Sequence, residues 1–357
     1  MEFIRNHGRK GTAARRLVSV AAVAATVALL ATGCASGSSS TSTGTAGAAA
    51  GDLSITFIPK QLNNPYTDVV LGGGKKGATE AGFGATQVVG PLEASASSQV
   101  SFINAETQAG TKVIVIAAND PDAVGPALTE ARAGGAKIVA FDSDTNPKYR
   151  DVFISQVVAK DVALIQTKLI SEQIGGSGEI AILSATANAT NQNGWIKFMD
   201  EELASNPAYK DIKLVAKVYG DDDDTKSFQE AQGLLQAHPN LKGIISPTTV
   251  GIAATARYLS TSEYKGKVAL TGLGLPNEMR PFVKDGTVTA FALWDPAQLG
   301  YVAAFAGKAL VDGTITGKEG DTFTAGALGK KTVDADGLVV VGPPTTFTKD
   351  NIDQYDF

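Results

Sequence analysis

The chain has 357 residues and a formal net charge of −5, with 19% charged residues, one cysteine and two histidines. An acidic chain is a poor partner for nucleic acid, and we expect none. Cys34, His7 and His238 are too few for a Ser-His-Asp or Cys-His catalytic arrangement or a His-based zinc site. The composition therefore argues against the common His-dependent enzymes and predicts no metal or cofactor.

The first part of the chain has the pattern of a secretory signal. Five basic side chains precede an apolar run at 17–31 that is too short to span a membrane comfortably, and small residues then lead to Cys34. We predict a signal peptide at 1–33, lipidation of Cys34, and a flexible Ser/Thr/Gly tether at 34–51. Ala31 stands where a lipidation motif usually has leucine, and a buried structural cysteine is the alternative.

Without residues 1–33 the 31 Lys and Arg fall to 26 and the 36 Asp and Glu to 35, which gives a net charge of −9. A body of about 300 residues exceeds what a single core usually supports, so we predict two lobes in a monomer. The expected N-terminal lobe comprises 52–155 and about 296–325. The expected C-terminal lobe comprises 156–295 and about 326–357.

Short apolar strands alternate with amphipathic helices along the body. In the first lobe we predict strands at 53–58, 85–89, 113–117 and 137–141, and helices at 66–81, 95–109 and 121–133. In the second we predict helices at 162–174, 193–204, 227–237, 251–259 and 277–283, and strands at 179–183, 213–218, 243–246, 268–272 and 288–293. A helix at 297–310 returns to the first lobe, and a strand at 337–341 closes the chain. Buried strands linked by crossover helices predict an α/β fold of two doubly wound, Rossmann-like parallel-sheet lobes joined by a hinge.

Polar side chains follow the predicted strands of both lobes. Because ligands bind beyond the carboxyl ends of parallel strands, we expect these residues to face one cleft. The candidate ligand-binding residues are Lys60, Asn119, Asp120, Asp142, Gln156, Asn191, Gln192, Pro247, Thr249, Trp294 and Asp295. Amides and carboxylates suit adjacent sugar hydroxyls, and the indole of Trp294 suits an apolar ring face. Any one of them could instead be a turn or helix-cap residue, Asp295 before Pro296 above all.

Two other motifs favour structural interpretations. The glycine-rich stretch 72–77 lacks the residue order of a phosphate loop and lies in a helical pattern, so we interpret it as small residues that permit close helix packing. The acidic run 221–224 lacks the spacing of a calcium loop, and we interpret it as a solvated run at the start of the next helix. A carboxylate pair such as Asp142 and Asp295 could serve a glycosidase, but in an amide-rich cleft we expect such groups to accept ligand hydroxyls.

The chain resembles a solute-binding protein of a bacterial ABC sugar importer, of the ribose-binding type. The stretches NATNQNGW (188–195), YGDDDD (219–224), SPTTVG (246–251), FALWDP (291–296) and NIDQYDF (351–357) resemble the rhamnose-binding branch. A sister branch binds autoinducer-2, and its ligand positions correspond to Lys60, Asp142, Asn191 with Gln192, and Pro247 with Thr249. That branch has aspartate at position 191 and alanine at 249, which disfavours autoinducer-2 here.

The resemblance implies a periplasmic binding protein type I fold and a non-enzymatic function. We expect an extracytoplasmic lipoprotein, anchored to the cell membrane through Cys34, that captures a monosaccharide and delivers it to ABC permease subunits. L-Rhamnose is the expected ligand; autoinducer-2 or another pentose or deoxy-sugar is the alternative. A sugar-sensing receptor that docks on a signalling partner is the competing class of function.

Overall fold

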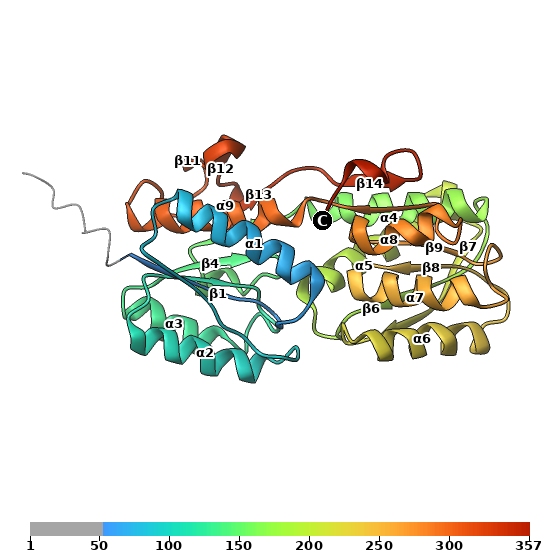
Figure 1. Ribbon diagram of the computed structural model, residues 1–357, viewed down its shortest axis with the longest axis horizontal. Helices are drawn as coiled ribbons and strands as arrows, with labels where there is room; N and C mark the ends of the chain where they lie inside the picture. Colours follow the sequence, from blue (N-terminus) through green and yellow to red (C-terminus); the bar gives the residue numbers. More distant parts are fainter. Residues whose placement is uncertain (1–52) are drawn as a thin grey trace, which may run out of the picture. The chain divides into compact units, whose positions relative to one another are not determined.

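The computed structural model describes residues 53–357 (Figure 1). The predicted signal peptide, the lipidation site at Cys34 and the tether lie outside the described residues. Within 53–357, no helix combines the length and the apolar character needed to cross a bilayer.

The N-terminal lobe is built on a six-stranded sheet whose strands all run parallel. In sheet order the strands are β13 (Leu338–Val340), β5 (Val152–Ser155), β4 (Lys137–Phe141), β3 (Val113–Ile116), β1 (Ser54–Ile58) and β2 (Ala85–Val88). Its helices are α1 (Pro65–Glu80), α2 (Ala96–Ala109), α3 (Gly125–Ala133) and α9 (Pro296–Val311). Helices α1 and α9 share a buried core with one sheet face, and α2 and α3 share one with the other, so the sheet is covered on both sides.

Helices α1 and α9 run side by side in close contact (Figure 1). A Cβ atom on Gly73 would lie 1.9 Å from the backbone oxygen of Ala297, and one on Gly77 would lie 2.8 Å from that of Tyr301. Gly72, on the outer face, would meet nothing within 4 Å. The interpretation of the glycine-rich stretch as a helix-packing surface is therefore confirmed.

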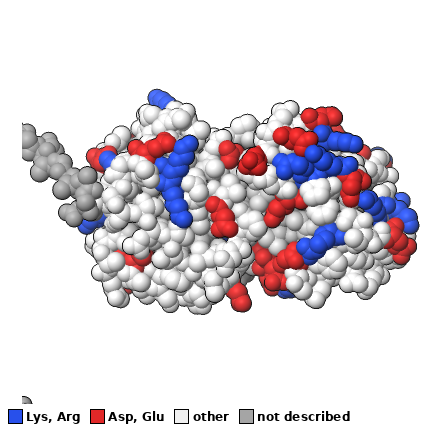
Figure 2. All heavy atoms as spheres, viewed as in Figure 1, with Lys and Arg blue, Asp and Glu red and all other residues white. Residues whose placement is uncertain are grey.

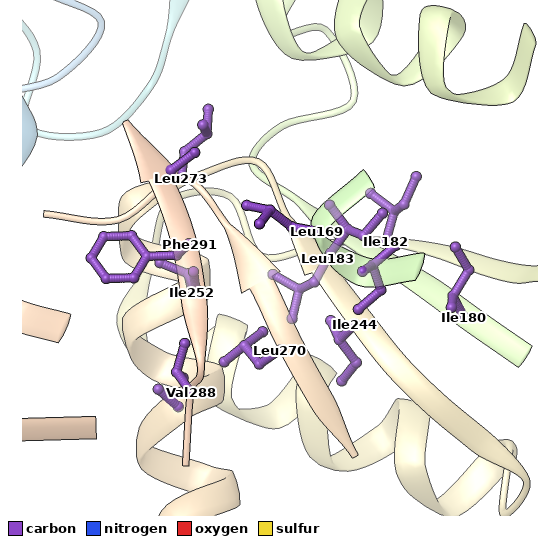
Figure 3. Close-up of a cluster of buried hydrophobic side chains, with 14 of the residues drawn as sticks. Leu169, Ile180, Ile182, Leu183, Ile244, Ile252, Leu270, Leu273, Val288 and Phe291 are labelled. Atoms are coloured by element: carbon purple, nitrogen blue, oxygen red, sulfur yellow. The ribbon is translucent and has the colours of Figure 1, made fainter. Parts of the chain in front are cut away.

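The C-terminal lobe contains a parallel four-stranded sheet and an antiparallel pair. The sheet order is β7 (Ile212–Tyr219), β6 (Gly178–Ser184), β8 (Leu241–Ser246) and β9 (Ala269–Gly272), and the pair is β10 (Ala290–Leu293) with β14 (Thr345–Thr348). The helices are α4 (Ala159–Ile174), α5 (Thr190–Ser205), α6 (Asp224–Ala237), α7 (Thr249–Thr261) and α8 (Pro276–Lys284). Figure 3 shows apolar side chains of β6, β8, β9 and β10 and of α4 and α7 meeting in one core.

The remaining elements are short. A hairpin of β11 (Thr322–Thr324) and β12 (Lys330–Thr332) follows α9. Single 3-10 turns occur at Pro147–Tyr149, Pro207–Tyr209, Gly326–Leu328, Ala335–Gly337 and Ile352–Gln354. On the face drawn in Figure 2, basic and acidic side chains are interspersed. The described residues form surface ion pairs such as that of Arg257 with Asp224.

The fold class is confirmed, but the lobe assignment of the C-terminal segment differs from the prediction. The predicted last strand, β13, pairs in parallel with β5 of the N-terminal sheet, and Val333 and Val339 lie in the N-terminal core. Residues 326–341 therefore belong to the N-terminal lobe, and only β14 and the residues after it pack on the C-terminal core. Strands β5, β11, β12 and β14 were not predicted. The chain thus passes between the lobes after β5, after β10 and between β13 and β14.

Candidate ligand-binding cleft

The ends of the strands in both lobes surround one cleft of about 630 Å³, part of which opens to solvent. Loops after β1 and β4 and the start of α1 form its N-terminal wall. The first turn of α5, the loops after β7, β8 and β9, and the end of β10 form its C-terminal wall. The lining side chains are Pro59, Lys60, Gln61, Asn64, Tyr66, Thr67, Val70, Ala117, Phe141, Asp142, Asn191, Gln192, Trp195, Asp222, Pro247, Thr248, Thr249, Leu273, Leu293 and Trp294.

Asp142 is the centre of the polar side of this cleft. It follows β4 directly and adopts the left-handed region (φ 59°), which is uncommon for a non-glycine residue but tolerated best by Asp and Asn. Its Oδ1 accepts hydrogen bonds from Gln156 Nε2 at 2.9 Å and from the Tyr66 hydroxyl at 3.1 Å. Burial, together with the Asp142 carboxylate, raises the pKa of Tyr66 well above its ordinary value, so the phenol is a donor at neutral pH.

Lys60 and Asn191 face the other oxygen of Asp142 from opposite lobes. The Lys60 ammonium donates to Asn191 Oδ1 at 3.1 Å and lies 3.6 Å from Asp142 Oδ2. The Asn191 amide nitrogen lies 3.4 Å from the same oxygen. The side chains of Lys60 and Asp142 are only 15% and 11% exposed, so their interaction is screened less than that of a surface pair.

A buried glutamine fixes the loops behind this polar cluster. Gln99, fully buried in α2, donates to the backbone oxygens of Pro59 at 3.0 Å and Ala117 at 2.7 Å, and it accepts from the Asn119 backbone at 2.9 Å. The Asn119 side chain in turn donates to the Lys60 backbone oxygen at 2.8 Å. The loops after β1 and β3 are therefore held together, which limits where the Lys60 side chain can point.

The other side of the cleft is aromatic and aliphatic. The Trp294 ring packs edge to face with Tyr66 and Trp195, with ring centroids 6.2 and 5.9 Å apart. Its indole N–H donates to the Tyr66 hydroxyl at 3.0 Å. Leu273 and Leu293 complete this wall. The cleft therefore presents one apolar side and one side rich in donors and acceptors, which suits a small polyol.

Seven of the predicted ligand residues line the cleft, and four do not. Those in the wall are Lys60, Asp142, Asn191, Gln192, Pro247, Thr249 and Trp294. In this wall, the side-chain oxygen of Gln192 already accepts from Ser184 Oγ at 2.7 Å and from the Ala185 backbone at 2.8 Å. Its amide nitrogen has no protein acceptor in the described chain.

The four others lie behind the wall. Asn119 and Gln156 support Lys60 and Asp142, as described above. Asp120 accepts from the backbone of Asp122 at 3.0 Å and Ala123 at 2.8 Å and so stabilises its own turn. Asp295 caps α9 by accepting from Ala297 N at 3.0 Å. None of these four side chains therefore lines the cleft, and the helix-cap alternative describes Asp295.

Several cleft residues were not predicted from the sequence. They are Gln61, Asn64, Tyr66, Thr67, Val70, Trp195, Asp222, Thr248 and the apolar wall residues. Asp222 corrects an interpretation, because the acidic run was expected to be solvated throughout. Asp223 does cap α6 at 2.7 Å and Asp224 pairs with Arg257 on the surface, but Asp222 is half-buried in the cleft wall. The position of Tyr66 in the first turn of a helix was indicated locally, because it follows the helix cap Asn64 and Pro65.

Two doubly wound lobes around a cleft of this kind define a solute-binding protein of the periplasmic type. A family model described as "Periplasmic binding protein domain" matches residues 55–315, and the chain belongs to this family. Members of the family are extracytoplasmic binding proteins.

Three similar proteins narrow the class. A sugar ABC transporter protein of Actinomyces odontolyticus, known from a crystal structure, is 70% identical and aligns over 86% of this chain and 99% of its own, with a TM-score of 0.71. A solute-binding protein of Clostridium phytofermentas solved with bound L-rhamnose is 38% identical over 85% and 98%, with a TM-score of 0.81. The D-apiose import binding protein of Actinobacillus succinogenes is 27% identical over 261 residues, 70% of this chain and 80% of that protein. The chain is thus a sugar-binding protein of the ABC-transporter class, and not an enzyme.

Proposed function

We propose that this protein is an extracytoplasmic lipoprotein that captures L-rhamnose between its lobes and delivers it to an ABC permease. One observation carries the proposal: Lys60, Asp142 and Asn191 converge from both lobes on a cleft whose other side is formed by Trp294 and Trp195. A ligand that contacts both lobes at once favours their closed arrangement, which is how such a protein couples binding to a change of shape.

The chemistry of a 6-deoxyhexose matches both sides of the cleft. Its ring carries adjacent hydroxyls, which charged donors and acceptors bind at about 1.5–3 kcal/mol each. Its methyl group and the C–H face of its ring would lie against the indoles and the two leucines. The L-rhamnose-bound relative, at 38% identity, lends further support, as do the five sequence stretches of the rhamnose-binding type.

Two geometric details weigh against autoinducer-2. The amide of Asn191 accepts from Lys60 with its oxygen and points its nitrogen at Asp142. An aspartate at this position would place a second carboxylate 3.4 Å from Asp142 and remove the amide donor, so the cleft offers the ligand a different set of donors and acceptors from that of the autoinducer-2 branch. Thr249 adds a hydroxyl where the autoinducer-2 branch has alanine, which further changes the ligand that fits.

Isothermal titration of the purified protein tests the sugar. The panel is L-rhamnose, L-fucose, D-ribose, D-apiose and autoinducer-2, and we expect L-rhamnose to bind tightest. Tight binding of a pentose or autoinducer-2 with no heat from L-rhamnose would reject the ligand assignment. A cell that keeps taking up L-rhamnose at the normal rate after deletion of the gene would reject the transport assignment and leave the signalling receptor.

The lipid anchor is tested separately. Metabolic labelling with an alkyne fatty acid should label the parent chain, while the Cys34→Ser chain should stay unlabelled and be released from the membrane fraction. Equal membrane retention of both chains would argue against an anchor at Cys34. Gel filtration with light scattering should give the mass of a monomer.

A further inference from the structure

Asp222 enters the cleft wall through an unusual turn between β7 and α6. Both Asp221 and Asp222 adopt the left-handed region, with φ of 56° and 51°, a conformation that is strained for two successive non-glycine residues. The neighbouring acids are engaged outside: Asp221 pairs with Lys226, and Asp223 caps α6. The turn therefore points a single carboxylate of the acidic run toward the cleft.

Contacts from both lobes hold Asp222 in place. Its Oδ1 accepts a hydrogen bond from the hydroxyl of Thr248, just before α7. Its backbone oxygen accepts from Gln61 Nε2 at 3.4 Å, a bond that crosses from the N-terminal lobe. Within residues 53–357, no group donates to Oδ2. Asp222 lines both the cleft and a second surface groove, which is bordered by Leu62 and Val250, so Asp222 lies at the cleft mouth.

The charges around Asp222 are unbalanced. Burial raises the pKa of Asp222, and the charges of Asp142 and Asp221 act in the same direction, while the Thr248 hydroxyl and Lys60 oppose them. Two carboxylates, Asp142 and Asp222, thus line the cleft beside one ammonium, that of Lys60. A ligand hydroxyl would satisfy the free oxygen of Asp222, whereas a ligand carboxylate or phosphate would be repelled.

We propose that Asp222 contacts the ligand at the cleft mouth, where its free carboxylate oxygen accepts a sugar hydroxyl and excludes acidic sugars. The inference rests on the proposed function, because it refines which sugars the cleft admits.

The test compares Asp222→Asn with Asp223→Asn in the full chain, since the two variants make the same chemical change at adjacent positions. Titration with L-rhamnose should show a loss of about 10- to 100-fold for Asp222→Asn, as expected for a hydrogen bond to a charged group. Asp223→Asn should bind like the parent, because asparagine also caps a helix. Equal affinities for all three proteins would overturn the proposal.

Two further measurements separate ligand contact from a structural role. Among single-deoxy analogues of L-rhamnose, the one lacking the contacted hydroxyl should bind the parent more weakly but bind Asp222→Asn no more weakly than L-rhamnose does. The preference for L-rhamnose over L-mannuronate, the corresponding 6-carboxylate, should fall at least tenfold in Asp222→Asn. The contact would be contradicted if the losses of affinity from the substitution and from the missing hydroxyl added for every analogue. It would also be contradicted if the preference for L-rhamnose over L-mannuronate were unchanged in Asp222→Asn.

Thermal melting of the variant tests whether Asp222→Asn changes the stability of the fold. Because burial disfavours the charged carboxylate, Asp222→Asn should melt at or above the parent temperature at neutral pH. Melting well below the parent would assign Asp222 to the fold and count against the proposal. A parent that binds none of the sugars would instead overturn the proposed function, and the role of Asp222 with it.

Discussion

Substitution of Asp142 by asparagine tests the centre of the cleft with the smallest possible change. Asparagine tolerates the left-handed backbone of this position at least as well as aspartate. Its side-chain oxygen can keep the bonds from Gln156 and Tyr66, which both reach Oδ1. Its nitrogen must then replace Oδ2, where the Lys60 ammonium lies at 3.6 Å and the Asn191 nitrogen at 3.4 Å.

The magnitude follows from these contacts. Three donors would meet at the place of one acceptor, and a ligand hydroxyl would lose its charged partner. A hydrogen bond to a charged group contributes about 1.5–3 kcal/mol, so the dissociation constant for the sugar should rise by about 10- to 150-fold. Stability should change less, because both bonds to Oδ1 remain.

Isothermal titration with L-rhamnose measures the effect, and Asp295→Asn is the matched control. Both aspartates follow a strand, but Asp295 lies outside the cleft wall and caps α9, a task asparagine performs equally well. The control should therefore bind like the parent. Equal losses in the two variants, or none in Asp142→Asn, would show that proximity to Lys60 and Asn191 does not determine binding.

Three further substitutions test packing, a buried ion pair and the aromatic wall. Gly73→Ala should lower the unfolding free energy by about 1–3 kcal/mol through overpacking against α9, whereas Gly72→Ala should raise it by about 0.5–1 kcal/mol. Denaturant titration measures both values, and equal effects of the two substitutions would contradict close packing of α1 on α9 at Gly73. Arg150→Met should lower the unfolding free energy by about 3 kcal/mol at neutral pH, because it leaves the Asp144 carboxylate without its bidentate partner. Burial holds the pKa of Asp144 above its ordinary value, and protonation of Asp144 removes the unpaired charge. The difference in unfolding free energy between the parent and Arg150→Met should therefore shrink as pH falls through that raised pKa, and a difference that grows would refute this. Trp294→Phe should weaken sugar binding roughly fivefold, since about 1 kcal/mol is lost with the N–H bond to Tyr66, and should remove most of the ligand-induced change in tryptophan fluorescence; an undiminished change would place the ligand elsewhere.

The fold was predictable wherever a segment's burial follows from its own pattern. Strand β3 is continuously apolar and fully buried, and the helices carry apolar faces at the expected spacing. The missed strands are short, and their patterns are less apolar than that of β3: β5 ends in Ser155, and β14 has three threonines and a single apolar residue, Phe347. Strand β13 was found, but its lobe was not, because its partner β5 lies far away in the sequence. The local sequence pattern predicts that a segment is a strand but does not indicate which sheet the strand joins.

The site was predictable to the level of the strand ends and no further. Trp294 and Asp295 are adjacent, yet one lines the cleft and the other caps a helix, because the carboxylate can reach the backbone N–H of Ala297. Asp222 was missed for the opposite reason. Nothing in a run of four aspartates indicates which one a left-handed turn directs inward. Tyr66 contacts Asp142 from a helix, so no rule based on residues after strands could include it.

The bonds between the lobes bear on how a sugar could be held. Lys60 with Asn191, Tyr66 with Trp294 and Gln61 with Asp222 each join one lobe to the other. Their lengths are 3.1, 3.0 and 3.4 Å. The two neutral bonds contribute about 0.5–1.5 kcal/mol each, and the bond from the charged Lys60 ammonium contributes about 1.5–3 kcal/mol. A sugar that inserts between Lys60 and Asn191 exchanges one such bond for several. Its measured affinity is therefore a difference between new and displaced contacts. Substitutions at Lys60 or Asn191 should affect both terms. A substitution at Asp142 should do so as well, because its Oδ2 lies 3.4 Å from the Asn191 nitrogen of the other lobe.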